Sequence, residues 1–116
     1  MKLMIEVSVG DFIDRLSILE IKKEHGLDVA EELSQYSKSF NVFDPIGFDH
    51  YRNLLVAVNS RLWILEDQKR KFSERSSEEY SNVSELITQL NDLRFAIKKK
   101  ADSYFKSAIS EKKSHC

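Results

Sequence analysis

The chain has 116 residues, of which 41% are hydrophobic and 32% charged. This length suits one domain with one modest core, because folding at this size hides roughly two-thirds of the surface of the unfolded chain. The 19 acidic and 18 basic residues nearly cancel, so no overall field steers the protein to nucleic acid or anionic lipid. The composition therefore excludes a second domain and argues against a nucleic-acid partner.

The few special residues point to no metal, redox or membrane role. The one cysteine, Cys116, is the last residue, and the three histidines lack zinc-site spacing. Glu6 interrupts the apolar residues before Gly10, which leaves too short a run for a signal peptide or a membrane span. We expect a cytoplasmic protein that binds no metal or cofactor and does not enter the membrane.

The first nine residues have the pattern of a strand. Leu3, Ile5, Val7 and Val9 alternate with other residues, which is the period of a half-buried strand. A lone strand leaves its backbone donors unpaired, so it would pair with the same segment of another subunit. An extended arm over residues 1–9 that packs on helices is an equally good interpretation.

Two helices are predicted next. Ser8 followed by Asp11 resembles a capping box, so the first helix should begin near Ser8 or Gly10 and stop at Gly26. The second should begin at Asp28 and carry one apolar stripe. Residues 41–48 are then predicted as a loop, because they contain the pair Asp44-Pro45 and Gly47.

The rest of the chain favours two long helices. Residues 48–116 contain neither glycine nor proline. A third helix should open at Asp49 and run to the polar break at residues 73–77, and a fourth should continue to about Ser110 from a capping box at Ser76 and Glu79. Residues 110–116 should fray.

The predicted fold is all-α: one domain, 1–116, with about four helices and the third and fourth packed as an antiparallel hairpin. At 1.5 Å per residue these two helices would span roughly 35 and 50 Å, longer than a compact domain of this size needs. Uncovered apolar stripes on such helices are commonly completed by a second subunit, so we expect a dimer or higher homo-oligomer.

Polar residues recur at helical spacing on three of these helices and define a candidate ligand site. Arg94 and Lys98 lie one turn apart, where a planar guanidinium and a compact ammonium can hold a phosphate or carboxylate together. Salt bridges to Glu66 and Asp67 are the alternative. No catalytic residue is assigned, and the nine candidate ligand-binding residues are Asp14, Arg15, Lys22, Asn59, Trp63, Glu66, Asn91, Arg94 and Lys98.

Three segments carry a resemblance to a known group of sequences. Residues 7–22 read VSVGDFIDRLSILEIK, residues 62–67 read LWILED, and residues 91–98 read NDLRFAIK. They resemble the blocks SxGELxDKxTILEIK, LWxIED and NDxRxxxK of an uncharacterised bacterial and phage domain family of unknown function. Departures include Arg15, where that family has lysine, Ala101-Asp102 in place of isoleucine and asparagine, and His115 in place of tyrosine.

The resemblance implies a genomic setting and a set of polar positions, but no chemistry. Members of the family are often encoded near glycosyltransferase or surface-polysaccharide genes. The family's polar positions correspond here to Asp14, Arg15, Glu20, Lys22, Asn59, Trp63, Glu66, Asn91, Asp92, Arg94, Lys98 and Glu111.

Three functions fit these observations. The first is a non-catalytic oligomer that binds a small anionic ligand between helices, such as a nucleotide, a nucleotide-derived signal or a sugar nucleotide, and in its sharpest form sequesters it. The second is a structural or interaction protein, in a polysaccharide-synthesis setting, whose polar stripes only specify helix register. The third is a small helical enzyme in the style of chorismate mutase, which needs no metal.

Overall fold

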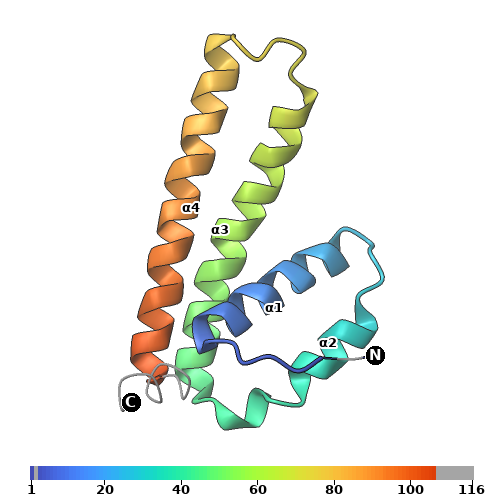
Figure 1. Cartoon of the computed structure of the whole chain (residues 1–116), viewed down its shortest axis with the longest axis vertical. Coiled ribbons are helices and arrows are strands. Elements are labelled where there is room, and N and C mark those ends of the chain that lie inside the picture. Colours follow the sequence, from blue (N-terminus) through green and yellow to red (C-terminus); the bar gives the residue numbers. More distant parts are fainter. Residues whose placement is uncertain (2, 107–116) are drawn as a thin grey trace.

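The protein is an all-α bundle, as predicted (Figure 1). The computed structural model describes Met1 and residues 3–106, and these residues contain no strand. The helices are α1 (Val9–Glu24), α2 (Ala30–Ser37), α3 (Pro45–Lys71) and α4 (Glu78–Phe105), with a short 3₁₀ turn η1 (Phe40–Val42) between α2 and α3. The described residues before α1 form an extended arm and not the predicted strand, but Leu3, Met4 and Ile5 are exposed, so these residues do not pack on the helices as the alternative interpretation expected.

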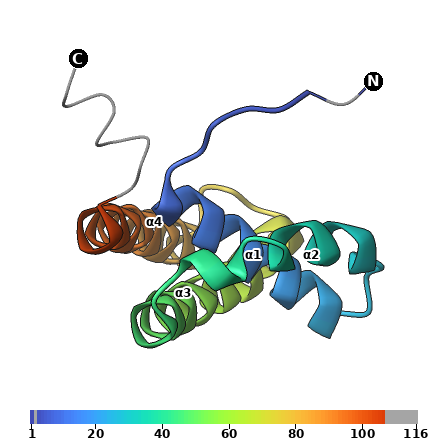
Figure 2. The ribbon, with the colours of Figure 1, turned by 90° about the horizontal axis from the view of Figure 1, so that it is seen from below.

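The long helices α3 and α4 pack as an antiparallel hairpin, and α1 lies across one half of it (Figures 1 and 2). With 27 and 28 residues, the two helices are each about 40 Å long at 1.5 Å per residue. No helix in the described part of the chain is both long and apolar enough to cross a membrane.

Helix α1 begins and ends where the sequence predicts. The Asp11 amide donates a hydrogen bond to Ser8 Oγ at 3.1 Å, which satisfies one of the unpaired donors of the first turn. After Glu24 the chain turns at Gly26, whose φ of 83° is a backbone conformation that side chains with a Cβ rarely adopt.

The starts of α2 and α3 differ from the prediction. Helix α2 begins at Ala30, two residues after the predicted Asp28, and the Ala30 amide donates to Asp28 Oδ1 at 3.4 Å. Helix α3 begins at Pro45, four residues before the predicted Asp49, with the Asp44 side chain accepting from the Gly47 amide. Proline favours a first helical position, because its missing N–H is unpaired there anyway.

Helix α4 is capped by Ser77, whose Oγ accepts from the Tyr80 amide at 3.1 Å, and not by the predicted Ser76. It ends at Phe105, with Lys106 in the left-handed conformation. The predicted continuation to Ser110 and the predicted frayed segment 110–116 lie outside the described residues.

The core lies where α1 meets the hairpin. Ile13 and Leu16 of α1 are buried against apolar side chains of α3 and α4, among them Leu55 and Ile97. A Cβ on Gly10 would lie 2.3 Å from the Lys98 carbonyl oxygen, so only glycine permits this approach of α1 to α4. The Gly10 amide also donates to Asp102 Oδ1 at 2.6 Å, which fixes the start of α1 on α4.

Candidate functional site

A buried carboxylate joins the three main helices. Asp14 of α1 is only 3% exposed. Arg94 of α4 donates from Nε to Asp14 Oδ1 at 2.8 Å and from Nη2 to Asp14 Oδ2 at 2.6 Å. Asn59 of α3 donates from Nδ2 to Asp14 Oδ1 at 2.9 Å. The position of α1 on the hairpin is thus specified by one side chain, because a buried charge is costly without such partners.

Three further side chains complete this polar cluster. The Asn59 amide also donates to Ser17 Oγ at 2.8 Å, and the Ser17 hydroxyl donates to the Asp14 carbonyl oxygen at 2.6 Å. Lys98 Nζ lies 2.6 Å from Asp11 Oδ1 and 3.9 Å from Asp14 Oδ2. The cluster therefore pairs two acids of α1 with two bases of α4.

The pKa of Asp14 is lowered and the pKa of Arg94 is raised. Burial alone would raise the pKa of Asp14, but hydrogen bonds from Arg94 and Asn59 and the charges of Arg94 and Lys98 outweigh it and lower that pKa. The hydrogen bond to Asp14 raises the pKa of Arg94 despite partial burial. Both groups are therefore charged at neutral pH, and Asp14 is poorly suited to transfer protons there.

A groove opens beside this cluster, between α1, α3 and α4. Its volume is about 310 Å³, at the lower end of small-molecule sites. Its lining includes one aromatic side chain, Trp63. The Trp63 ring stacks on His25, with ring centroids 4.6 Å apart and planes 13° apart. The lining residues are Ile18, Ile21, Asn59, Leu62, Trp63, Glu66, Arg70, Asn91 and Arg94.

The structure brings most of the predicted site residues together. Five of the nine, Asn59, Trp63, Glu66, Asn91 and Arg94, line this groove. Asp14 contacts the groove residue Arg94 but does not line the groove itself. Lys98 lines a neighbouring depression, which shares Asn91 and Arg94 with the groove. Arg15 is exposed and Lys22 is half-buried, and neither lines the groove.

Several contacts of the site were not predicted from the sequence. Arg94 pairs with Asp14, whereas Asp67 pairs with Arg70 and Lys71 of its own helix. Ser17 is not among the predicted site residues. Its position one turn after Asp14 is a usable signal, because residues one turn apart lie on the same helix face. Ile18, Ile21 and Leu62 supply the apolar floor.

The groove carries little net charge. Arg94 is paired with Asp14, and Arg70 lies 3.5 Å from Asp67. Within the described residues the Glu66 side chain, which lines the groove, has neither a hydrogen bond nor an ion pair. Because Asp14 binds Nε and Nη2 of Arg94, the third nitrogen, Nη1, is left outside that bidentate pair. The groove thus offers a guanidinium donor on Arg94, which Asp14 holds in place, and a carboxylate acceptor on Glu66.

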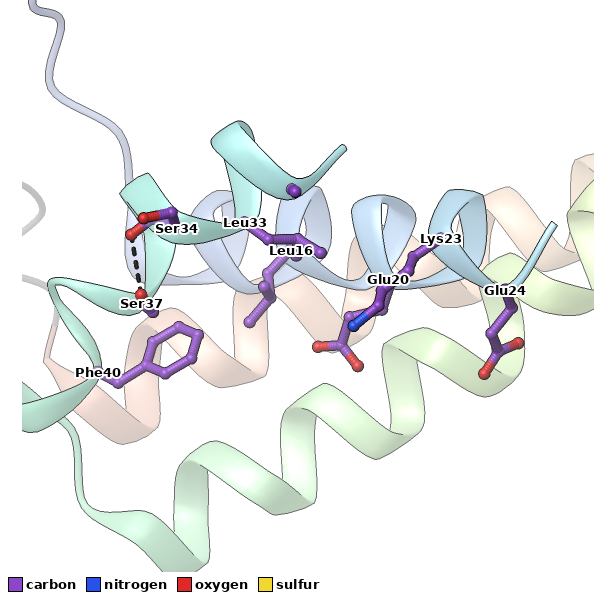
Figure 3. A pocket seen from close by; sticks show the side chains of 9 residues that line it. Leu16, Glu20, Lys23, Glu24, Leu33, Ser34, Ser37 and Phe40 are labelled. Carbon is purple, nitrogen blue, oxygen red and sulfur yellow. Dashed lines mark hydrogen bonds between the residues drawn. The ribbon is translucent and has the colours of Figure 1, made fainter. Parts of the chain in front are cut away.

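A second, larger groove of about 730 Å³ lies between α1 and α2 (Figure 3). Its walls are the apolar side chains of Leu16, Leu33 and Phe40, and Glu20, Lys23 and Glu24 of α1 stand along its rim. Burial raises the pKa of Glu20, an effect that Arg52, 3.8 Å away, partly offsets. Among the described residues, no group of three or more histidine, cysteine, aspartate or glutamate side chains could hold a metal ion.

The class of protein defined by these observations is a four-helix α-bundle with a polar groove beside a buried ion pair. Compared with family models, curated proteins and solved structures, the chain matches none of them.

Proposed function

We propose that the groove between α1, α3 and α4 binds a small ligand with a planar ring and one anionic group, and that a mononucleotide is the class that fits it best. The supporting observation is that side chains from three helices converge on one groove beside a guanidinium that Asp14 holds in place. A group held in this way loses little conformational freedom when a ligand binds.

Each part of such a ligand has a matching side chain. Trp63 presents an aromatic ring for stacking, as in many base- and sugar-binding sites. Glu66 accepts hydrogen bonds, which favours a base edge with adjacent N–H donors, as in guanine. Arg94 and Arg70 then face the phosphate, and the Asn91 amide can pair with hydroxyl groups.

The groups gathered here suit binding more than catalysis. Asp14 is locked into a bidentate pair and has a lowered pKa. Arg94 is paired with Asp14, and Arg70 with Asp67. Because these pairs reduce the positive charge available to a ligand, one phosphate suits the groove better than several. We therefore propose a cytoplasmic, oligomeric binding protein that holds a nucleotide or nucleotide-derived signal, with membership of the resembled family as a further proposal.

The only tryptophan of the chain, Trp63, lines the groove, so its fluorescence can report binding directly. Wild-type protein titrated with GMP should show a saturable change, and AMP should bind more weakly because it lacks the paired donors for Glu66. The variant Asn91→Ala should bind GMP at least about tenfold more weakly, since it loses one polar contact from an exposed position.

The matched control is Asn53→Ala. Asn53 is exposed on α3 and lies outside this groove, so its replacement should leave both fluorescence and GMP binding unchanged. Equal GMP binding by the two variants, or no response of wild type to GMP, AMP or a sugar nucleotide, would remove the groove from consideration as this ligand site.

A second candidate function has its own support. Each charged member of the buried cluster already has an opposite charge within the chain, as a purely architectural network would. A protein of this kind would tolerate the paired replacement Asp14→Leu with Arg94→Met, because buried ion pairs can often be exchanged for apolar residues without loss of stability. The ligand proposal also expects the double variant to fold, but it predicts that GMP binding is lost relative to wild type, whereas a purely architectural network predicts no GMP binding by either protein.

A further inference from the structure

The N-terminal arm, which the structure describes at Met1 and residues 3–7, carries apolar side chains that its own helices do not cover. Leu3 is 82%, Met4 96% and Ile5 73% exposed. Figure 2 shows the described part of the arm leaving the start of α1 and running clear of the helices. Consecutive large apolar residues in water are unfavourable, so a partner surface that covers them would gain stability.

The groove between α1 and α2, separate from the proposed ligand site, is an open apolar surface of matching kind. Leu16, Leu33 and Phe40 form its walls, and Ala30 leaves room beside them. In Figure 3 Leu33 of α2 lies next to Leu16 of α1. The groove holds about 730 Å³, which is ample for a few side chains of an extended segment.

We propose that the arm of one copy lies in the α1–α2 groove of a second copy, and that the exchange is reciprocal in a two-fold dimer. Because the arm runs away from its own helices, a surface that covers it lies outside its own chain, and a second copy presents such a groove. Reciprocal exchange covers the exposed Leu3 and Ile5 of both chains at once, as an isologous interface requires.

Extended segments from a partner are held by pockets for alternate side chains, and Leu3 and Ile5 are spaced for this role. The alternation of the first residues, which resembled a strand, thus serves the exchange without a sheet.

The first test is the oligomeric state of the full chain. Sedimentation equilibrium of wild type should show a dimer. The double variant Leu3→Ser with Ile5→Ser should weaken it at least about tenfold, because two apolar side chains lose their burial. Both positions are exposed in the single chain, so circular dichroism should show unchanged helix content.

The groove side is tested by Ala30→Glu. Ala30 is the exposed first residue of α2, where an acid is favourable to the helix, yet the longer side chain fills the groove and should dissociate the dimer. The matched control is Ala57→Glu on α3, at an exposed position outside the groove, which should leave the dimer intact.

The partner is identified by cysteine cross-linking in a Cys116→Ser background. Mixing Ile5→Cys chains with Ser34→Cys chains should give a disulfide-linked heterodimer, because Ser34 lines the groove, whereas Ile5→Cys with Ser81→Cys on α4 should not. A monomer at all concentrations, a dimer insensitive to the arm and groove variants, or the absence of a cross-link between the Ile5→Cys and Ser34→Cys chains would overturn the proposal.

Discussion

The two halves of the hairpin are built differently. Where α1 crosses it, α3 and α4 bury several side chains, whereas beyond Leu65 of α3 and before Ile87 of α4 no described residue is buried. The far end is held by exposed and half-buried contacts, such as the edge of Phe72 against Tyr80 at 6.0 Å. Packing of α1 on the hairpin of α3 and α4 therefore creates a bundle with a core and with a groove.

The largest effect should come from Asp14, which holds α1 to both long helices. Asp14→Ala leaves Arg94 and Asn59 without their acceptor and should lower the free energy of unfolding by about 3–5 kcal/mol. Urea denaturation followed by circular dichroism measures this. Asp92→Ala, an exposed change on α4, should cost less than about 0.5 kcal/mol; similar losses for the two variants would contradict the account.

One substitution made in both halves sharpens the comparison. Phe48 of α3 is 6% exposed, in the half that α1 covers, and Phe72 is half-buried near the far end. Phe48→Ala should cost about 3–5 kcal/mol, and Phe72→Ala roughly half as much or less. Amide hydrogen exchange of Phe72→Ala should quicken only near the far end, whereas exchange throughout α1 would show that the two halves unfold together.

A smaller effect is expected where α1 touches α4. Gly10→Ala places a Cβ against the Lys98 backbone, which cannot move aside easily, and should cost about 1–3 kcal/mol. Gly26→Ala has open space but a positive φ and should cost about 1 kcal/mol. If thermal melts showed Gly26→Ala to be the more harmful change, the close approach of α1 to α4 would be wrong.

The smallest effect concerns pH. The folded-state pKa of Asp14 is lowered, so its contribution is fully present above the unfolded value, about 3.9, and is lost as pH falls through the folded pKa. Wild type should lose more stability than Asp14→Asn between neutral pH and about pH 3. The difference between the two curves isolates Asp14, since Asp44 and Asp67 also have lowered pKa values. Parallel curves would contradict the paired carboxylate.

Much of the fold could be predicted from the sequence because helices leave local signals. The absence of glycine and proline after Gly47 indicated two long helices, and Ser8 marked the start of α1. The sequence predicts the start of α3 four residues too late, because the pair Asp44-Pro45 indicates a loop, whereas in the structure it serves as N-cap and first helical residue.

The candidate site was predicted only in part. Helical spacing places Asn59, Trp63 and Glu66 on one stripe of α3, and all three line the groove. It does not give the rotation or crossing of one helix against another. The pairing of Asp14 with Arg94, 80 positions apart, depends on that packing and so could not be deduced from spacing.

The most direct test of the ligand groove is native mass spectrometry of wild-type and Asn91→Ala protein purified from the producing cells, recorded before and after denaturation. The account predicts a reproducible added mass per chain on the wild type, released on denaturation, and reduced in Asn91→Ala but not in Asn53→Ala. Wild-type protein with no added mass, even after incubation with GMP, would contradict it.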